Sequence, residues 1–346
     1  MAASEEPKFL QGLCMEMCPN HERMLREKQK RLHPFERVEN GSDTDMKQPV
    51  DIVVKKYSRP AAGKQLDPNN LRPASVLVKT MNYLMTDVLN KPHPWYYKYG
   101  FISDRIRSIR QDLTAQNIQS FEAIDILEKA TRYYLIMAVK LSQEPLENYD
   151  PILHYTHLKE CLRKLLDLYQ LHNKMNKSYN QRRQASFEAC NLILNLRSAD
   201  VYYLIIRIDD LLKECKEIQL AIHLIKLHLN GNFIGLFRAA SKLPSLESCA
   251  FFCHIQPIRC KGLSIMNTAF SSKNLSYPLA LLVDNFCFDS GELAAEFCAT
   301  HNILVNDGKV FFNKGQFVKT NKHKSCLCHK LVGAKIKDDI SDMITC

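Results

Sequence analysis

Two cysteines and a histidine near the start of the chain are the residues best suited to chemistry. Cys14, Cys18 and His21 have C-x3-C-x2-H spacing and could supply three ligands to a zinc ion. Tetrahedral zinc takes four ligands, and the next candidate, His33, follows a segment with a helical pattern. Cysteines four residues apart also share one face of a helical turn, where a free thiol buries like a small hydrophobic side chain. The spacing therefore favours buried thiols, and we expect no bound metal or cofactor.

Two other groups could suggest nucleophilic or metal chemistry, namely Cys253 with His254, and Cys326 and Cys328 with His329. Adjacent side chains on a helix point in different directions, so Cys253 and His254 form a poor nucleophile–base pair. A catalytic site also needs a base, an orienting group and an oxyanion-binding group together, and the sequence offers no such set. The common nucleotide-binding, zinc-protease and hydrolase motifs are missing too. We expect a non-enzymatic protein, with a thiol- or zinc-dependent enzyme as the alternative.

Composition limits the class of protein. The chain has 346 residues, 46% of them hydrophobic, which is enough for one large or two modest domains with a core. No apolar run is long enough to cross a membrane, and the first residues lack the pattern of a secretory signal. The 13 cysteines are odd in number and lie within helical patterns, which is typical of reduced thiols in the cytosol or nucleus. A net charge of +10 favours acidic partners.

Charge is most asymmetric between residues 303 and 330, where Asp307 is the single acid. The basic residues of this segment are Lys309, Lys314, Lys319, Lys322, Lys324 and Lys330. Solvated surfaces normally mix both signs of charge, so a run of one sign favours binding over mere solubility. We interpret the first five lysines as candidate contacts to RNA or another single-stranded nucleic acid.

The pattern along the chain predicts four regions. Residues 1–72 form an N-terminal motif and an extended arm, in which a nearly all-polar helix from Asn20 to Leu32 lies on other elements. Residues 73–275 form a stack of antiparallel amphipathic helices, beginning near Pro73 with the apolar stripe Leu77, Met81, Leu84 and Val88.

In residues 276–332 the pattern changes to two short helices followed by a hairpin. Ser290 is a good N-cap for the second helix. Asn306, Asp307 and Gly308 provide turn chemistry between two apolar runs. Two helices and a hairpin outline a winged helix, and residues 333–346 are left as a C-terminal tail.

Several short motifs, in this order, resemble the family of germinal-centre-associated nuclear protein (GANP) and the yeast Sac-domain scaffold of messenger-RNA export. The motifs are "GLCMEMCP..ER", "YSRPAAG", "LRP" and "DRIRSIRQDL". The residues that carry the likeness are Gly12, Cys14, Met17, Cys18, Pro19, Glu22, Arg23, Tyr57, Arg59, Pro60, Ala61, Ala62, Gly63, Asp104, Arg105, Arg107 and Arg110. The likeness is strongest to the small branch of the family that is linked to centrosome duplication.

The resemblance implies a mostly α, PCI-like helical stack that ends in a winged helix, as in scaffold subunits of the proteasome lid and of initiation factors. It implies a non-enzymatic scaffold in nuclear messenger-RNA export-type complexes, in centrosome duplication and mitotic spindle progression, or in both. The implied partners are a second PCI-type subunit and a small acidic lid-type protein, with no membrane. The implied locations are nucleus and cytoplasm, with the centrosome and spindle as further sites. The pore-anchoring and centrin-binding regions of the large members are not expected here.

Two further expectations concern Tyr57 of the arm and three arginines of the helical stack. Tyr57 should be buried where "YSRPAAG" packs on the helices, so that its loss would destabilise the fold. Arg105, Arg107 and Arg110 should fall off the apolar face of their helix, and we favour a structural role in which they neutralise Asp104, Asp112 and helix ends.

Overall fold

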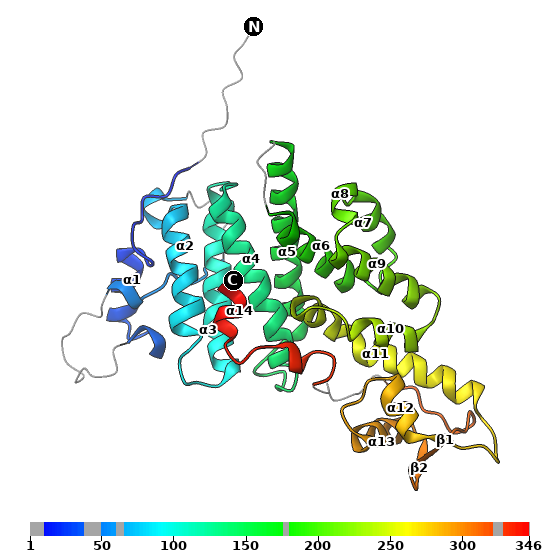
Figure 1. Cartoon of the computed structure of the whole chain (residues 1–346). Coiled ribbons are helices and arrows are strands. Elements are labelled where there is room, and N and C mark those ends of the chain that lie inside the picture. The colour runs from blue at the N-terminus through cyan, green and yellow to red at the C-terminus, as the bar shows by residue number, and fades with distance from the viewer. Residues whose placement is uncertain (1–9, 38–49, 60–65, 176–179, 321–327, 346) are drawn as a thin grey trace.

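The computed structural model describes residues 10–37, 50–59, 66–175, 180–320 and 328–345. Helices stand side by side in an elongated stack that follows the order of the chain, from α1 and α2 at one side to an α/β end at the other (Figure 1). The exception is the C-terminal segment, which returns to the N-terminal half, where α14 packs on α4. The expected mostly α fold class is confirmed, with one small sheet.

The described parts of the arm contain one short helix and three 3₁₀ turns. The helix is α1 (Asn20–Lys28), and the turns are η1 (Pro34–Glu36), η2 (Val50–Ile52) and η3 (Pro68–Asn70). The helix expected to reach Leu32 ends four residues earlier. Lys30 has a φ of 53°, in the left-handed region that an α-helix does not use, so the chain turns there. The polar helix lies on the rest of the arm, as expected.

The first half of the stack surrounds one central helix. Its elements are α2 (Ala74–Tyr83), the π-helical turn η4 (Leu84–Val88), α3 (Trp95–Ala115), α4 (Phe121–Lys140) and α5 (Pro151–Lys174). The predicted stripe of α2 and η4 is confirmed, because all four of its side chains are fully buried. Helix α4 is buried on nearly all sides, because it packs against α2, α5 and α11.

The second half continues with shorter helices and one long one. These are α6 (Gln181–Leu194), α7 (Val201–Arg207), α8 (Asp210–Lys213), α9 (Lys216–Leu229), α10 (Phe233–Ala240) and α11 (Ser245–Ala269). The side chains of Asn180, Asp209 and Asn232 accept hydrogen bonds from first-turn N–H groups, which fixes where α6, α8 and α10 begin. Pro257 lies inside α11, and the helix continues through it.

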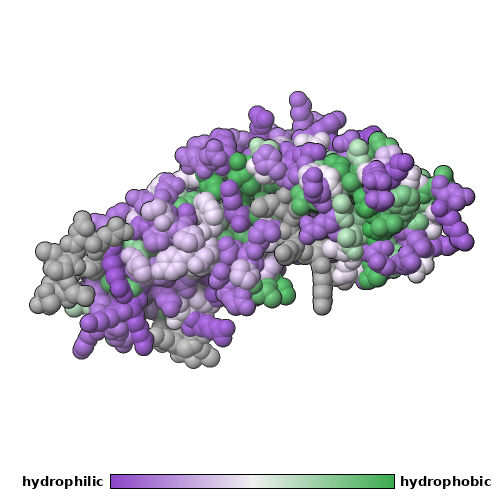
Figure 2. Space-filling model, turned by 90° about the horizontal axis from the view of Figure 1, so that it is seen from below, coloured by the Kyte–Doolittle hydropathy of each residue, from purple (hydrophilic) through white to green (hydrophobic). Residues whose placement is uncertain are grey.

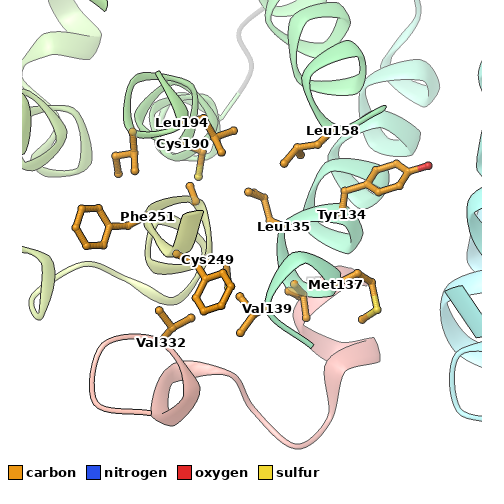
Figure 3. Packing of buried hydrophobic residues seen from close by; sticks show 14 of the residues in the cluster. Tyr134, Leu135, Met137, Val139, Leu158, Cys190, Leu194, Cys249, Phe251 and Val332 are labelled. Atoms are coloured by element: carbon orange, nitrogen blue, oxygen red, sulfur yellow. The ribbon is translucent and has the colours of Figure 1, made fainter. Parts of the chain in front are cut away.

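The core joins the two halves into one body. Figure 3 shows Leu135 and Val139 of α4 on the side of this helix that faces α6 and α11, where Cys190 and Cys249 lie, whereas Tyr134 and Met137 point to the opposite side. Val332, from the C-terminal segment, closes the same cluster from below. Because one continuous core runs along the stack, the helices form a rigid base for the elements at either end.

The α/β end (residues 277–318) packs on the end of α11. It consists of β1 (Tyr277–Pro278), α12 (Leu279–Asn285), α13 (Gly291–Thr300), β2 (Leu304–Asn306) and β3 (Lys309–Phe311). The strands form an antiparallel sheet in the order β1-β3-β2. The predicted N-cap is confirmed, because Ser290 Oγ accepts the N–H of Leu293 at 3.3 Å. The buried Arg259 of α11 ties this end to the stack by donating to the carbonyl oxygens of Phe286 and Cys287.

The C-terminal strap (residues 328–345) runs back across the stack. It contains η5 (Gly333–Lys335) and α14 (Ile340–Thr345). Lys335 Nζ donates to Leu243 O at 2.8 Å and to Ser248 Oγ at 2.9 Å. Ser341 Oγ donates to the carbonyl oxygen of Met85, within the π-helical turn η4, at 2.7 Å. From the sequence, residues 333–346 are expected to be a tail. In the structure, the C-terminal strap connects the α/β end to the first helices.

Shortening a buried side chain of the strap is expected to loosen this connection. Ile344 of α14 is fully buried, so Ile344→Ala should lower the free energy of unfolding by about 2 kcal/mol through lost burial and a residual cavity. The change is measured as a shift in the midpoint of chemical denaturation. Thr345→Ala, at the exposed neighbour, is the control, and equal midpoints for Ile344→Ala and wild type would mean that the strap does not dock.

Candidate functional site

The N-terminal motif begins where the chain passes close to the turn before α2. The N–H of Gly12 donates to Gln116 Oε1 at 2.8 Å, and the N–H of Cys14 donates to Leu71 O at 2.9 Å. A Cβ atom on residue 12 would lie 2.5 Å from Leu71 O. Only glycine allows this approach of two backbones, which explains the motif glycine physically.

The rest of this motif starts α1 and holds the arm beside it. Met17 is buried, Pro19 immediately precedes the helix, and Arg23 lies in its first turns. Glu22 Oε1 accepts the backbone N–H of Lys56 at 2.8 Å. The helix therefore uses a motif carboxylate to bind the extended strand of the arm.

A buried carboxylate, Glu36, lies at the centre of the arm. It has no exposed surface and accepts hydrogen bonds from the guanidinium groups of Arg26 and Arg105. It also accepts the N–H groups of His33 and Val54, both at 3.0 Å. Burial alone would raise the pKa of Glu36, but the two arginines and the two N–H groups outweigh it and lower the pKa below its ordinary value of 4.5. We call Glu36, Arg26 and Arg105 the Glu36 cluster.

Asp104 and Arg105 of α3 hold the arm strand from the other side. Asp104 Oδ2 accepts the backbone N–H of Tyr57 at 3.2 Å and pairs with Arg105. Arg105 pairs with Asp104, as expected, but its side chain is only 5% exposed, so it does not lie on a solvated surface. The arm covers it, and the period of α3 alone carries no information about an element that is distant in sequence.

A second buried carboxylate, Asp112, holds the end of the arm. Its Oδ1 accepts Lys55 Nζ at 2.6 Å, and its Oδ2 accepts Arg72 Nε at 2.7 Å. Arg72 is fully buried and also donates to Met17 O and Ser108 Oγ. The expectation that the arginines of α3 neutralise Asp112 is therefore wrong, since its partners come from the arm. We call Asp112, Arg72 and Lys55 the Asp112 cluster.

Tyr57 is half-buried and does not lie in the core, which corrects the expectation for this residue. Its ring packs beneath the guanidinium of Arg107, with the carbon at the centre of that group 3.9 Å from the ring centroid. Arg59, two residues along the strand, is exposed. The remaining motif residues of this segment, Pro60, Ala61, Ala62 and Gly63, lie outside the described residues.

Arg110, one turn after Arg107, takes part in a charged group with α5. Its Nη2 donates to Glu160 Oε2 at 2.7 Å, and His157 Nδ1 lies 3.5 Å from the same oxygen. Burial is the main cause that lowers the pKa of His157, and the nearby Arg107 and Arg110 lower it further, against Glu160. Its Nε2 atom is buried and has no hydrogen-bond partner within the part of the chain that the structure describes.

The thiols of the motif are buried, as the spacing predicts. Cys14 is 8% exposed and Cys18 is 1% exposed, and burial raises the pKa of both. Over the described ranges, no group of three or more histidine, cysteine, aspartate or glutamate side chains could hold a metal ion. Burial also raises the pKa of Cys253 to about 11 and lowers that of His254 to about 4, so neither is in the charged form that an ion-pair nucleophile needs.

The predicted hairpin is present at the α/β end. Asp307 and Gly308 have φ angles of 46° and 70°, as a two-residue turn of the hairpin type requires. Leu304 of β2 and Phe311 of β3 are cross-strand partners, and both are exposed. Lys309 is exposed on the same face of β3 as Phe311, two residues before it. The outer face of the hairpin thus combines an apolar pair with a lysine.

The five candidate lysines do not all lie on the hairpin. Lys309 lies in β3, whereas Lys314 and Lys319 follow it in an exposed segment. The N–H of Lys314 donates to Ser271 Oγ just beyond α11, so the chain has folded back toward the stack at that point. Lys322 and Lys324 lie outside the described residues. Seen from below, apolar residues gather on the surface of the α/β end, with hydrophilic residues around them (Figure 2).

The clusters of the arm depend on Arg26 and Glu36, which sequence reasoning did not select, and on Arg72 and Asp112, whose partners it did not identify. Arg72 and Asp112 lie in the recognised motifs "LRP" and "DRIRSIRQDL". Glu36 and Arg105 are 69 residues apart, and no periodicity pairs residues at that separation.

Sequence comparison places these features in a family. The model described as the SAC3/GANP family matches residues 17–307, which include most of the arm, the whole helical stack and the α/β end as far as Asp307 of the hairpin turn. Among the described residues, no helix has the length and apolar character needed to span a membrane.

Three relatives match nearly the whole chain. Protein xmas of Drosophila melanogaster is 27% identical over 97% of this chain and 16% of its own length. SAC3 family protein B of Arabidopsis thaliana is 26% identical over 98% of this chain and 20% of its own length. SAC3 family protein 1 of Schizosaccharomyces pombe is 28% identical over 94% of this chain and 34% of its own length. The chain thus spans between 16% and 34% of the length of these relatives, and with a family match over most of its residues it belongs to the SAC3/GANP family.

Proposed function

We propose that this protein is a non-enzymatic scaffold that acts in messenger-RNA export-type complexes, in centrosome duplication and spindle progression, or in both. Membership of the SAC3/GANP family supports the scaffold role. The chain corresponds to only 16% to 34% of the relatives' lengths, so the roles of those whole proteins extend to it only as proposals. Nucleus and cytoplasm, with centrosome and spindle, are the proposed locations.

The fold is proposed to be a PCI-like helical stack that ends in a winged helix. The α/β end supports this, because its elements follow the order strand, helix, helix, hairpin, and all three strands form one antiparallel sheet. The strap and Arg259 fix this end on the stack, so it can act as a rigid contact surface.

The hairpin face carries the proposal of RNA binding. Exposed Phe311 offers an aromatic surface on which an unpaired base can stack, and Lys309 beside it can contact a phosphate. Lys314 and Lys319 extend the positive charge along the following segment. Stacking combined with lysine contacts is typical of single-strand binding, which depends on charge more than on base sequence.

A second PCI-type subunit and a small acidic lid-type protein are the proposed protein partners. Strand β2 lies at the edge of the sheet, where its free backbone groups can pair with a strand from another chain. The net charge of +10 suits an acidic partner.

The alternative of a thiol-dependent enzyme has little support. Burial raises the pKa of the thiols at Cys249 and Cys298 to about 12, and that of Cys161 to about 11. A nucleophilic cysteine needs the opposite shift, together with a base beside it. A scaffold has no such requirement.

Reversing two lysine charges is expected to weaken RNA binding by an electrostatic route. Each phosphate contact contributes about 0.7 to the slope of log affinity against log salt for a single strand, so Lys314→Glu with Lys319→Glu should flatten the slope by about 1.4. The measurement is fluorescence anisotropy with a labelled single-stranded RNA over a series of salt concentrations. Lys159→Glu with Lys164→Glu, on the exposed face of α5, makes the same change in net charge and is the control.

Co-purification with a tagged second subunit is measured on the same variants. If the lysine pair variant keeps its RNA affinity and salt slope but loses the subunit, these residues form a protein interface and the RNA proposal is wrong. If neither property changes, the lysines are a solvated surface.

A further inference from the structure

A groove opens on the side of the molecule where the arm crosses α3. Its volume is about 800 Å³, and it is lined by the arm strand, the start of α1, the turn before α2, and facing turns of α3 and α5. This volume suits a few residues of a bound chain or a small molecule. The groove lies in the N-terminal half, on elements different from those of the hairpin proposed to contact RNA.

The acidic residues that line the groove already have partners. Asp112 is shared by Lys55 and Arg72, and Glu160 is shared by Arg110 and His157. Glu22 accepts the N–H of Lys56 and pairs with Arg26, and Asp67 caps the turn that follows it. Within the described residues, three of the four lining carboxylates pair with cations, and Asp67 is held by N–H groups of its own turn.

Two arginines in the groove lack such a partner. Within the described residues, Arg59 and Arg107 form no ion pair, and residues 60–65, which follow Arg59, contain no acidic residue in "PAAGKQ". Arg107 is held in place by Tyr57, whose ring covers one face of its guanidinium, so the N–H groups at its edge keep their direction. A fixed guanidinium is ready to bind an anion with little loss of entropy.

A third polar group lies beside them. His157 lines the groove, and only 8% of its surface is exposed. Its Nε2 atom is the one described above as having no hydrogen-bond partner among the described residues. Arg107 is close enough to lower the pKa of this histidine. Groups from the arm, α3 and α5 thus line the same groove, where they could donate to the outer oxygens of a phosphate group.

We propose that this groove binds a phosphate group carried by a side chain of a partner peptide. Two arginines, one of them stacked on an aromatic ring, together with a polar histidine, form a site for a dianion rather than for a single carboxylate. A nucleic-acid backbone fits less well, because among the described lysines and arginines of the lining only Arg59 and Arg107 lack a paired carboxylate. Arg107 also covers one face of the Tyr57 ring, so that face is not open to a base. The site does not depend on RNA binding by the hairpin.

The test is fluorescence anisotropy of the full chain with a labelled pool of short peptides that have a central phosphoserine and varied flanking residues. The phosphorylated pool should bind at least about tenfold more tightly than the same pool with serine, as loss of a charge-assisted contact predicts. Arg107→Gln should lower the affinity for the phosphorylated pool about tenfold, and so should Arg59→Gln, made separately at an exposed residue. Arg163→Gln, an exposed arginine of α5 outside the groove, should leave it unchanged.

Several results would overturn the proposal. One is equal affinity for the phosphorylated and unphosphorylated pools, and another is unchanged binding in Arg59→Gln, which is exposed and should not disturb folding. Displacement by inorganic phosphate at the affinity of the pool itself would mean a free-phosphate site. If single-stranded RNA displaces the peptide pool, and Arg107→Gln loses the binding of both RNA and peptide, the groove is a nucleic-acid site instead.

Discussion

Replacing Glu36 with glutamine is expected to lower the free energy of unfolding by about 3–5 kcal/mol. Glutamine keeps the size of the side chain but removes the charge that balances Arg26 and Arg105, whose side chains are 10% and 5% exposed. Breaking a buried ion pair by neutralising one partner leaves charge that water cannot reach. The loss is measured by urea denaturation, with far-UV circular dichroism to confirm that the variant folds.

Asp51→Asn is the matched control, because Asp51 forms an exposed ion pair with Lys79. Exposed pairs contribute little, so its unfolding free energy should stay within about 1 kcal/mol of wild type. An equally small change for Glu36→Gln would show that the Glu36 cluster does not hold the arm.

The same cluster predicts a direction of pH dependence. The pKa of Glu36 is lower in the folded protein than its ordinary value of 4.5, so the folded state binds fewer protons at this site than the unfolded state. The stability that Glu36 contributes is therefore present above pH 4.5 and is lost as the pH falls below that value. The Glu36→Gln variant should lose less stability than wild type over the same fall in pH.

Replacing Asp112 with asparagine is expected to have an effect of similar size, about 3–5 kcal/mol. Both carboxylate oxygens are used, one by Lys55 and one by Arg72, and the Arg72 and Asp112 side chains have no exposed surface. Without the carboxylate, Arg72 keeps a buried charge that only neutral acceptors contact. The arm should separate from α3 more often, so limited proteolysis of the arm should be faster in addition to the loss of stability.

Asp67→Asn is the control for proteolysis. Asp67 lies in the arm, five residues before Arg72, and is exposed, and asparagine can cap the same turn. If Asp112→Asn is cut no faster than Asp67→Asn and unfolds at the wild-type midpoint, the Asp112 cluster does not anchor the arm.

Features of this molecule that depend on local sequence could be predicted. The turn at Asp307 and Gly308, the cap at Ser290 and the stripe on α2 and η4 follow from backbone conformation and periodicity within a few residues. Burial of Cys14 and Cys18 was also predicted, because their spacing gave no complete ligand set and favoured a structural role.

Features that join distant segments could not be predicted from periodicity. Arg105 looks like a surface residue of α3 until the arm covers it, and Asp112 takes its partners from the arm and not from its own helix. The strap is a similar case. Nothing in the last residues indicates that Lys335 donates to the backbone near α10 or that Ser341 reaches Met85. Such contacts depend on which surfaces the remainder of the fold leaves uncovered.

Photo-crosslinking offers the most direct test of RNA binding by the scaffold. The full chain is bound to a single-stranded RNA that contains 4-thiouridine, irradiated and digested, and the crosslinked peptides are identified by mass spectrometry. The account predicts that the main crosslinks fall on residues 304–319, with Phe311 among the modified residues because its exposed ring can stack on a base. Crosslinks confined to the helical stack or the arm, or none at all, would contradict it.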